Sequence, residues 1–589
     1  MNRPYQQKAL DGSVAKWKAG IYRQLHVMAT GTGKTHCFAQ LPKIFQPYLP
    51  GKMLVLAHRE ELIDQAIAKI QAENPGKRID KEKAEHVADP VNADIVVASV
   101  ASIGNRLIKY DWSLFDKFVI DEAHHSTADS YMRILNDARL FDLELPGHPG
   151  VKNNKLLTGW TATPQRGDGE ALAKVYTEIA TVYTIREAIE DGWLVDVKGY
   201  RVRTDTSLDD VKTTAGDFNQ RQLADTVDTP ERNLQAYKAW MKLAQDRQTI
   251  GFCVSIEHAQ HLAELFRKHD VLAEAIWGDD PDRKKKLDLF RAGEIEVLFN
   301  CDILTEGFDM WQVECVMNLA PTKSPVKYVQ RVGRGTRLQE GTGNLRLWKQ
   351  GTGNPRLWKQ EHSLEQTIKH DCIIIDLVDN CTRNSLITLP TLMGLPNTTD
   401  LQGKSMVWAV KQMEDAQKEF PYVDFSKLPD LSKLNQYIQE VNLFDISFKD
   451  EIKADSTLSW HPAPTGGYTL LLPVRTEMKD GEEVKTYESV TIKQNLLDKW
   501  EMSTRLDNVN YKAERDTLAE VLKVADKLIL TKRSDAFRLV KQEQAWHNEP
   551  ATDAQKKMIK RFYKGRQIPV DLNKGKASRL ISAHLSGRA

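Results

Sequence analysis

The sequence predicts an α/β protein with two parallel sheets in tandem, followed by a smaller α+β region. Short, continuous apolar runs separated by helical patterns are typical of parallel strands that are buried on both faces. One series of such runs occupies residues 53–57, 95–98, 118–121 and 156–159. A second series has the same character, and its runs lie at residues 249–254, 273–276, 297–300, 315–319 and 372–377.

The pattern weakens between the two series and changes again beyond about residue 399. There a charged helical stretch at 407–418 precedes alternating runs at 467–473 and 489–492, which suggest a small antiparallel sheet. Helical patterns resume from Tyr511 to the end. The predicted parts are a first α/β domain at 1–199, a linker at 200–229, a second α/β domain at 230–398, an accessory α+β region at 399–548 and a basic helical tail at 549–589.

Composition excludes several classes of protein. No apolar run is long enough to cross a bilayer, and the N-terminus lacks the apolar core of a signal peptide, so we expect a cytoplasmic protein, nucleoid-associated if bacterial or phage. The six cysteines are scattered and no two have C-x-x-C spacing, so neither a zinc site nor a disulfide framework is expected. The net charge of +1 does not argue against nucleic acid, because a basic channel can lie inside a neutral whole.

A glycine-rich segment follows the apolar run 25–28, so a strand leads into a tight turn and then a helix. Backbone N–H groups in such a turn can cradle phosphates, Lys34 can neutralise their oxygens, and the Thr35 hydroxyl can bind Mg²⁺. The alternative is a glycine-rich loop with a chance lysine, and strict phosphate-loop spacing would place a glycine at Met28. The predicted ATP contacts of this segment are Thr30, Gly31, Thr32, Gly33, Lys34 and Thr35.

A pair of carboxylates ends the run 118–121. Asp121 at the tip of a strand can hold the Mg²⁺ shell, and Glu122 beside it can orient or deprotonate the attacking water. His124 and His125 raise the alternative of a metal site, but no third ligand lies at a usual spacing. We therefore predict that ATP and Mg²⁺ bind here, with Thr35 and Asp121 on the metal.

These two elements belong to an ordered series of segments that resembles the motifs of superfamily 2 DEAD/DEAH-box helicases. The glycine-rich segment itself matches the A-x-x-G-x-G-K-T form usual in helicases. The other segments, in chain order, are Arg3-Pro4-Tyr5-Gln6, Ala57-His58-Arg59-Glu60, Ser99-Val100, Thr161-Ala162-Thr163-Pro164, Thr305-Glu306-Gly307-Phe308-Asp309 and 330–337, Gln-Arg-Val-Gly-Arg-Gly-Thr-Arg.

The resemblance implies two RecA-like domains of the P-loop NTPase class and assigns a role to each segment. Gln6 would read adenine, and Gly307 and Asp309 would join the nucleotide site. Gln330, Arg334 and Arg337 would act with Lys34 and Glu122 in hydrolysis. The implied contacts to the nucleic-acid backbone are His58, Arg59, Ser99, Thr161, Thr163 and Thr305.

The spacing of the two arginines has a physical meaning of its own. Arg334 and Arg337 are three apart on a predicted helix and so share one face. They lie in the second domain, whereas Lys34 and Asp121 lie in the first, so ATP can bridge the two and domain closure becomes the power stroke. The alternative, a solvated helix face, would be the default in another context.

Several segments bear on the kind of helicase. Residues 165–169 and 187–192 look like DNA-directed DEAH-type helicases. The segments 378–404, 551–555 and 572–578 look like bacterial helicases related to the yeast mitochondrial branch-migration helicase. That resemblance implies ATP-driven remodelling of duplex, forked or branched DNA. An RNA helicase and the motor subunit of a restriction or defence assembly remain alternatives, although the C-terminal region carries no visible nuclease signature.

Two further features are open to two interpretations each. The decapeptides 341–350 and 351–360 form a tandem repeat, which is either a duplicated surface loop or a stacking and phosphate-binding finger. The tail 549–589 has ten Lys or Arg against three acids, which suits phosphate contacts but also suits a basic helical cap packed on the motor. Host, pathway, polarity and oligomeric state are not indicated by the sequence.

Overall fold

The computed structural model divides into two compact units, residues 1–407 and 408–589. The first unit holds two parallel sheets, and the second holds an antiparallel sheet. The structure describes residues 2–58, 60–145, 150–163, 172–214, 216–301, 303–304, 310–338, 369–380, 386–392, 395, 399, 401–419, 455–456, 458, 460–462, 467–479, 482–495, 499–534, 549–562, 572–575, 577 and 580–581.

The first sheet has seven strands in the order β3-β4-β2-β5-β6-β1-β7, and every pairing is parallel. Successive residues of β2 face opposite sides of the sheet, and both sides are buried, as the continuous apolar runs predict. The strands are β1 (Arg23–Met28), β2 (Lys52–Ala57), β3 (Ile79–Glu82), β4 (Ile95–Ser99), β5 (Phe115–Asp121), β6 (Leu156–Thr161) and β7 (Glu178–Tyr183).

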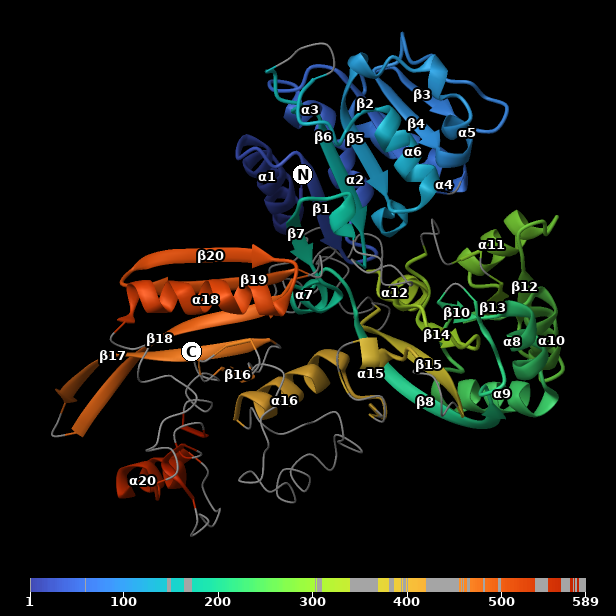
Figure 1. Cartoon of the computed structure of the whole chain (residues 1–589). Helices are drawn as coiled ribbons and strands as arrows, with labels where there is room; N and C mark the ends of the chain where they lie inside the picture. Colours follow the sequence, from blue (N-terminus) through green and yellow to red (C-terminus); the bar gives the residue numbers. More distant parts are fainter. Residues whose placement is uncertain are drawn as a thin grey trace, which may run out of the picture. The chain divides into compact units, whose positions relative to one another are not determined.

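Helices cover this sheet on both sides (Figure 1). Helices α1 to α4 contribute Leu10, Phe38, Phe45 and Ile63 to one hydrophobic core. Strand residues such as Val55 belong to the same core. The helices of this first domain are α1 (Pro4–Lys18), α2 (Lys34–Ala39), α3 (Leu41–Phe45), α4 (Glu60–Glu73), α5 (Val100–Gly104), α6 (Asp129–Asp137) and α7 (Ile185–Glu190), with 3-10 turns at Leu107–Lys109, Trp112–Leu114, Ala123–His125 and Leu172–Lys174.

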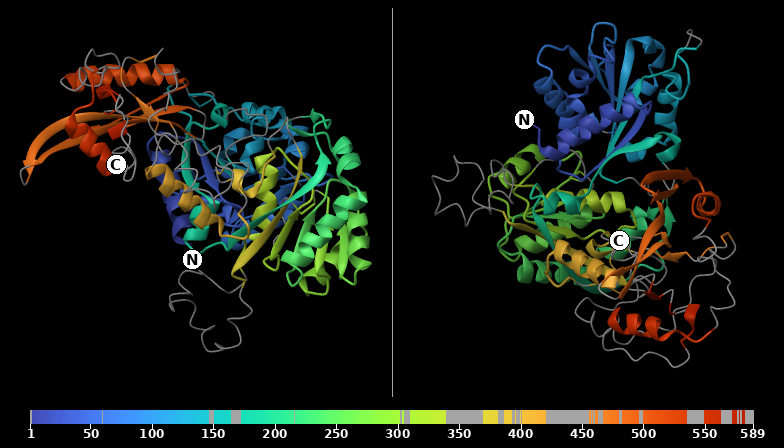
Figure 2. Two further views of the ribbon diagram at one scale, coloured as in Figure 1. Left: turned by 90° about the horizontal axis from the view of Figure 1, so that it is seen from below. Right: turned by 90° about the vertical axis from the view of Figure 1, so that its left-hand side faces the viewer.

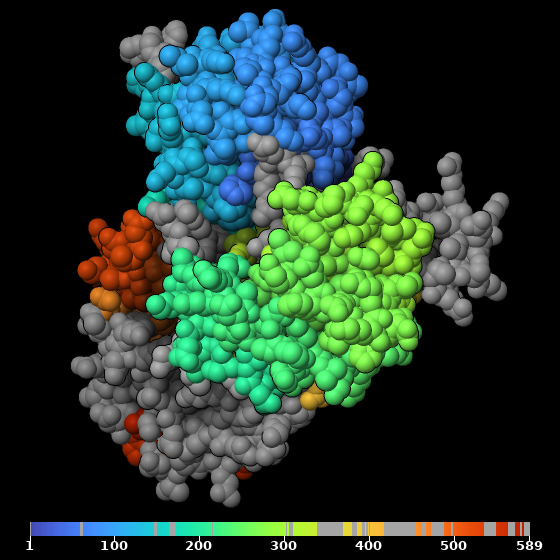
Figure 3. All heavy atoms as spheres, turned by 90° about the vertical axis from the view of Figure 1, so that its right-hand side faces the viewer, coloured from blue at the N-terminus to red at the C-terminus, as the bar shows by residue number. Residues whose placement is uncertain are grey.

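The second sheet has six parallel strands in the order β12-β13-β11-β14-β15-β8. The part of the chain that contains this sheet forms the green surface in Figure 3. Its main strands are β8 (Asp196–Ser207), β11 (Thr249–Phe252), β12 (Ala273–Ile276), β13 (Val297–Asn300), β14 (Cys315–Asn318) and β15 (Asp371–Asn380), beside a small hairpin of β9 (Thr213–Thr214) and β10 (Asp217–Phe218). Its helices are α8 (Gln220–Val227), α9 (Pro230–Leu243), α10 (Ile256–Arg267), α11 (Arg283–Arg291), α12 (Pro325–Gly335) and α15 (Leu389–Leu392).

The start of the second domain differs from the prediction. Residues 200–229 are not an unstructured linker, because β8 is the edge strand of the second sheet and pairs with β15 along its length. Helix α8 occupies a further part of the same stretch. The chain therefore passes from the first domain, residues 1–195, into the second domain, residues 196–407, at the start of β8.

The C-terminal unit contains the predicted antiparallel sheet, with five strands in sequential order from β16 to β20. Helix α18 lies across one face of this sheet (Figure 2) and closes a core with Leu470, Ile492 and Met502. Tyr511 belongs to a strand, so the helical pattern predicted from that residue begins later, at Leu518. The elements are α16 (Met406–Glu419), which spans the division between the units, β16 (His461–Pro462), β17 (Tyr468–Lys479), β18 (Glu482–Gln494), β19 (Trp500–Leu506), β20 (Val509–Arg515), α18 (Leu518–Lys532) and α20 (Asp553–Phe562).

Among the described residues, no helix has both the length and the apolar character needed to cross a bilayer. In the same residues no group of three or more His, Cys, Asp or Glu side chains is placed to hold a metal ion. Cys37, Cys253, Cys301, Cys315 and Cys372 are free thiols.

Candidate nucleotide and nucleic-acid sites

The glycine-rich turn joins the end of β1 to the start of α2. Gly31 and Gly33 both have φ of +85°, a conformation that side chains disfavour. A Cβ on Gly33 would also lie 2.6 Å from Gln6 Nε2. The Thr32 hydroxyl donates to the Ala29 carbonyl at 2.6 Å, which tightens the turn. Lys34, the first residue of α2, lies with its Nζ 3.4 Å from the Met28 carbonyl.

Gln6 supports this turn from helix α1. Its Nε2 donates to the Thr32 carbonyl at 3.0 Å, and its Oε1 accepts from the Arg3 N–H at 2.9 Å. The Tyr5 hydroxyl donates to the same Thr32 carbonyl at 2.8 Å. The buried Gln6 amide therefore holds the turn, and it does not line the adjoining cavity.

The carboxylate pair lies at the carboxyl end of β5. Asp121 is the last residue of the strand, and its Oδ1 accepts from the Glu122 N–H at 3.0 Å. Glu122 has φ of 49° and ψ of 55°, which is strained for a residue with a side chain. Its buried Oε2 accepts no hydrogen bond from the described residues, although His124 Nδ1 lies 3.4 Å away. The strained backbone thus holds a carboxylate whose Oε2 can accept a further hydrogen bond.

The second domain contributes helix α12 and the residues after it. Gly333 on α12 packs directly against Thr30, because a Cβ at Gly333 would lie 2.6 Å from Thr30 Cβ. Arg337 lies beyond the end of α12, so the two arginines do not share one helix face as predicted. Arg337 instead reaches the turn directly, with its Cγ 3.4 Å from the position of a Cβ on Gly31. Burial lowers the pKa of Arg337 to about 10.

One cavity of about 470 Å³ brings most of these residues together. Such a volume suits a small ligand. The predicted residues on its wall are Thr30, Gly31, Gly33, Lys34, Thr35, Asp121, Glu122, Arg334 and Arg337. Three of the predicted residues do not line the cavity, namely Gln6, Thr32 and Gln330. Two more, Gly307 and Asp309, lie outside the described residues.

The candidate nucleic-acid contacts lie at the carboxyl ends of the first sheet's strands. His58 follows β2 and is exposed, whereas Ser99, Thr161 and Thr163 are buried. The Ser99 hydroxyl caps helix α5, and the Thr161 hydroxyl donates to the Thr163 carbonyl at 2.7 Å. The Ser99 and Thr161 hydroxyls thus bond within the protein, whereas the Thr163 hydroxyl is buried and has no partner among the described residues. Of the described members of this set, only His58 presents its side chain to solvent. Arg59 and Thr305 lie outside the described residues.

A chain of contacts links this edge to the Glu122 carboxylate. The imidazoles of His58 and His125 stack with centroids 4.2 Å apart, and those of His125 and His124 lie 4.1 Å apart. His124 Nδ1 lies 3.2 Å from the Thr161 hydroxyl and 3.4 Å from Glu122 Oε2. The groups expected to contact nucleic acid and the group expected to activate water are therefore in direct physical connection.

Comparisons with known proteins match all three parts of the chain. Three family models match it: Type III restriction enzyme, res subunit, at residues 1–166, Helicase conserved C-terminal domain at 232–339, and Mitochondrial helicase Irc3, C-terminal domain, at 488–589. IRC3 of Saccharomyces cerevisiae, a proposed ATP-dependent helicase, is 33% identical over 406 residues, which are 67% of this chain and 53% of the yeast protein. The motor part and the C-terminal part of the chain are therefore both similar to helicases.

The chain has further relatives of two kinds. The proposed mitochondrial ATP-dependent helicase irc3 of Schizosaccharomyces pombe is 32% identical over 400 residues, covering 67% of this chain and 60% of that protein. The Type I restriction enzyme EcoAI endonuclease subunit of Escherichia coli is 27% identical over 384 residues, covering 58% of this chain and 45% of the subunit. The chain spans about half the length of these curated relatives.

The structure adds cavity residues that sequence reasoning missed. Arg3 stacks over the Trp193 ring with its guanidinium 4.7 Å from the ring centroid, and both line the cavity. The sequence signal was available, since Arg3 lies within the quoted Arg3–Gln6 segment and Trp193 directly follows the segment 187–192. The other additions have no local signal, and they are Gln65, Ala66, Lys69, Trp311 and Leu338.

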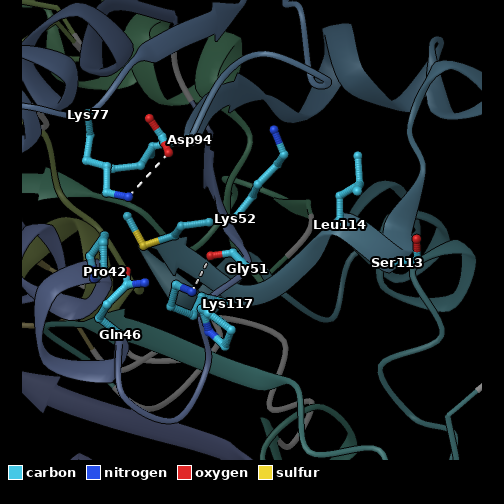
Figure 4. A pocket seen from close by; sticks show the side chains of 12 residues that line it. Pro42, Gln46, Gly51, Lys52, Lys77, Asp94, Ser113, Leu114 and Lys117 are labelled. Atoms are coloured by element: carbon cyan, nitrogen blue, oxygen red, sulfur yellow. Dashed lines mark hydrogen bonds and ion pairs between the residues drawn. The ribbon is translucent and has the colours of Figure 1, made fainter.

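A second cavity, of about 400 Å³, differs from the first in its electrostatics (Figure 4). It lies at the amino ends of β2, β4 and β5 and holds Lys52, Lys77 and Lys117. Each ammonium is already bound: Lys52 to the carbonyls of residues 91 and 93, Lys77 to Asp94, and Lys117 to two carbonyls and Asp116. Because internal acceptors satisfy these cations, this cavity is a poorer phosphate site than the one at the glycine-rich turn.

Proposed function

We propose that this protein is an ATP-dependent DNA helicase or translocase, which hydrolyses ATP to move on or remodel duplex and branched DNA. The observation that carries the proposal is the cavity lined by Lys34 and the Asp121–Glu122 pair from the first domain and by Arg334 and Arg337 from the second. A ligand in that cavity contacts both domains, so its binding and turnover are coupled to their relative position.

The residues present fit ATP and Mg²⁺. The turn with two left-handed glycines presents backbone N–H groups, Lys34 supplies a positive charge, and Thr35 and Asp121 supply the oxygens that Mg²⁺ prefers. Bound Mg²⁺ neutralises phosphate charge. Glu122 would orient or deprotonate the attacking water, for which its Oε2 has acceptor capacity. Arg334 and Arg337 would stabilise the negative charge of the transferring phosphoryl group.

DNA is favoured as the substrate by two findings. Both fungal relatives are named as ATP-dependent helicases, and the EcoAI relative is named as an endonuclease subunit of a restriction enzyme. His58 and the stacked histidines lie at the carboxyl edge of the sheet, where ligands of open α/β sheets bind. Forked or branched DNA is the preferred form because the segments after residue 378 resemble helicases related to the mitochondrial branch-migration enzyme.

The decisive experiment compares ATPase stimulation by duplex DNA, forked DNA, single-stranded DNA and RNA at equal nucleotide concentration. We expect forked DNA to stimulate most and RNA least. Stimulation mainly by RNA would replace the proposal with an RNA helicase, and the absence of stimulation by every nucleic acid would contradict a nucleic-acid motor.

Two variants identify the source of the activity. Lys34→Ala should weaken nucleotide binding, whereas Glu122→Gln should keep binding and lose turnover, because only water activation is removed. Near-normal turnover by Glu122→Gln would refute the assigned role of Glu122.

The EcoAI similarity favours one second candidate, the motor subunit of a restriction or defence assembly that translocates without separating strands. Strand separation and triplex displacement on the same DNA distinguish the two. Displacement of a triplex-forming strand without duplex unwinding would favour this second candidate.

A further inference from the structure

Lys69 lines the nucleotide cavity from a wall that no recognised motif supplies. Helix α4 buries Ile63 and Ile70 in the core that it shares with α2. Gln65, Ala66 and Lys69 occupy the neighbouring face of the same helix and border the cavity. The position of Lys69 is therefore fixed by the packing of α4, whatever the ligand.

Two charged groups of opposite sign act on Lys69. The carboxylate of Asp121 attracts its ammonium, and the guanidinium of Arg337 repels it. Burial and Arg337 together hold the pKa of Lys69 below its usual value, while Asp121 opposes the shift. Lys69, an exposed residue of α4, thus shares the cavity wall with Asp121 of the first domain and Arg337 of the second and is acted on by the charges of both.

We propose that Lys69 is a specificity-determining residue that contacts the terminal phosphate of a nucleoside triphosphate from the first domain, opposite Arg337. This inference rests on the proposed nucleotide site and assigns a further residue to it. Five cations lie on the cavity wall against the two carboxylates of Asp121 and Glu122, and they are Arg3, Lys34, Lys69, Arg334 and Arg337. Such a surplus suits a polyanion.

The electrostatics predict discrimination between nucleotides. Without an anion, Lys69 and Arg337 repel each other across the domain boundary. A terminal phosphate between them replaces this repulsion with two attractions, whereas a diphosphate leaves the repulsion in place. Lys69 therefore favours triphosphate over diphosphate, and after hydrolysis it favours separation of the two domains.

The competing interpretation is a lysine on a solvated helix face with no role in binding. Replacement by alanine is then neutral, because alanine is the better helix former and no core contact is lost. Lys8 on the exposed side of helix α1 is a matched control of this kind.

The test measures affinities for a slowly hydrolysed triphosphate, ATPγS, and for ADP, both with Mg²⁺, on the full-length protein. Lys69→Ala should weaken ATPγS binding by roughly 10- to 100-fold, the range for loss of one charged hydrogen bond, and leave ADP binding within about twofold. Lys69→Arg should retain most of the triphosphate preference, and Lys8→Ala should retain all of it. Melting temperature verifies that each variant is folded.

The outcomes separate this inference from the proposed function. An unchanged ratio of the two affinities in Lys69→Ala, or an equal loss for both nucleotides, overturns the terminal-phosphate role. If wild type binds neither nucleotide, the proposed ATP site itself fails. Loss of both nucleotides in Lys34→Ala, together with a normal ratio in Lys69→Ala, would leave the ATP site standing and remove only Lys69 from it.

Discussion

Gly333 of the second domain packs against Thr30 of the glycine-rich turn so closely that no side chain fits between them. A Cβ on Gly333 would lie 2.6 Å from Thr30 Cβ and 2.8 Å from Thr30 Cγ2. The two domains thus meet at the wall of the nucleotide cavity by a direct approach of the α12 backbone. This contact lies beside that of Arg337 with Gly31, so the two together limit how far the domains can approach at the cavity.

Gly333→Ala should therefore push α12 away from the turn and slow ATP turnover. Insertion of one methyl group into a packed contact costs about 1–3 kcal/mol, so we expect kcat to fall roughly 10-fold or more. ATP affinity should change less, because Lys34 and the turn belong to the first domain alone. Steady-state ATPase kinetics measure both quantities.

Gly104 at the end of α5 is the matched control, since a Cβ there would meet nothing within 4 Å. Gly104→Ala should leave kcat and melting temperature unchanged. Equal turnover in Gly333→Ala and Gly104→Ala would show that the domains do not meet in this way during hydrolysis.

Arg337→Ala should reduce turnover at least a hundredfold and leave ATP affinity largely intact. Arginines that stabilise the charge of a transferring phosphoryl group are typically worth about 10³ to 10⁵ in rate. Arg203→Ala, on an exposed position of β8, serves as the control for loss of a guanidinium. A loss that appears mainly as a higher KM with normal kcat would make Arg337 a ground-state contact and would remove support for the power stroke.

Variants in helix α20 can test whether the basic C-terminal region contacts DNA. Lys557, Lys560 and Arg561 are exposed, while Ile559 packs inward. Lys557→Ala with Arg561→Ala should weaken DNA binding and reduce the slope of log affinity against log salt by about 2, because each lost phosphate contact contributes about 0.9. The exposed pair Lys523 and Lys527 on α18 has the same spacing, and its double alanine variant is the control. Equal slopes for the two variants would favour a solvated cap.

His26 should make the first domain sensitive to acid. Burial lowers its pKa from 6.5 to about 3, and its ring stacks on Trp160 at 4.0 Å. Between these two pH values the unfolded chain binds a proton at His26 and the folded chain does not, so stability falls as pH is lowered through this window. At about 1.4 kcal/mol per pKa unit, the loss amounts to a few kcal/mol.

His26→Gln should flatten the fall of melting temperature between pH 6.5 and about 3, and His269→Gln at an exposed position should not. Identical pH profiles for wild type and His26→Gln would mean that other groups dominate the acid response.

The sequence predicted what depends on local pattern and missed what depends on tertiary contact. Buried strands such as β2 and β13 read as apolar runs and lie where they were expected. Strand β8 was taken for linker because, as an edge strand, it alternates apolar with polar residues. Strand β20 was taken for helix, although apolar and polar residues alternate from Val509 to Glu514.

The candidate site shows the same division. The glycine-rich turn and the carboxylate pair were found because their residues are adjacent in sequence. Lys69 and Trp311 could not be found, since their place on the cavity wall results from how α4 packs and how the second domain approaches. The prediction that Arg334 and Arg337 share one helix face was wrong because α12 ends at Gly335. Helical periodicity does not reveal where a helix ends.

The passage from the first domain to the second has a mechanical consequence. Trp193 lines the nucleotide cavity, the Val195 N–H donates to the Thr336 carbonyl at 2.8 Å, and β8 begins at the next residue. The chain thus passes from the first domain to the second beside the proposed nucleotide cavity, and no linker residues separate the two domains there. The connection between the domains can therefore act as a hinge beside the cavity. A small change in the width of the cavity would move the far side of the second sheet over a longer distance. Lengthening the connection at this point would uncouple hydrolysis from movement without altering a single group that contacts ATP.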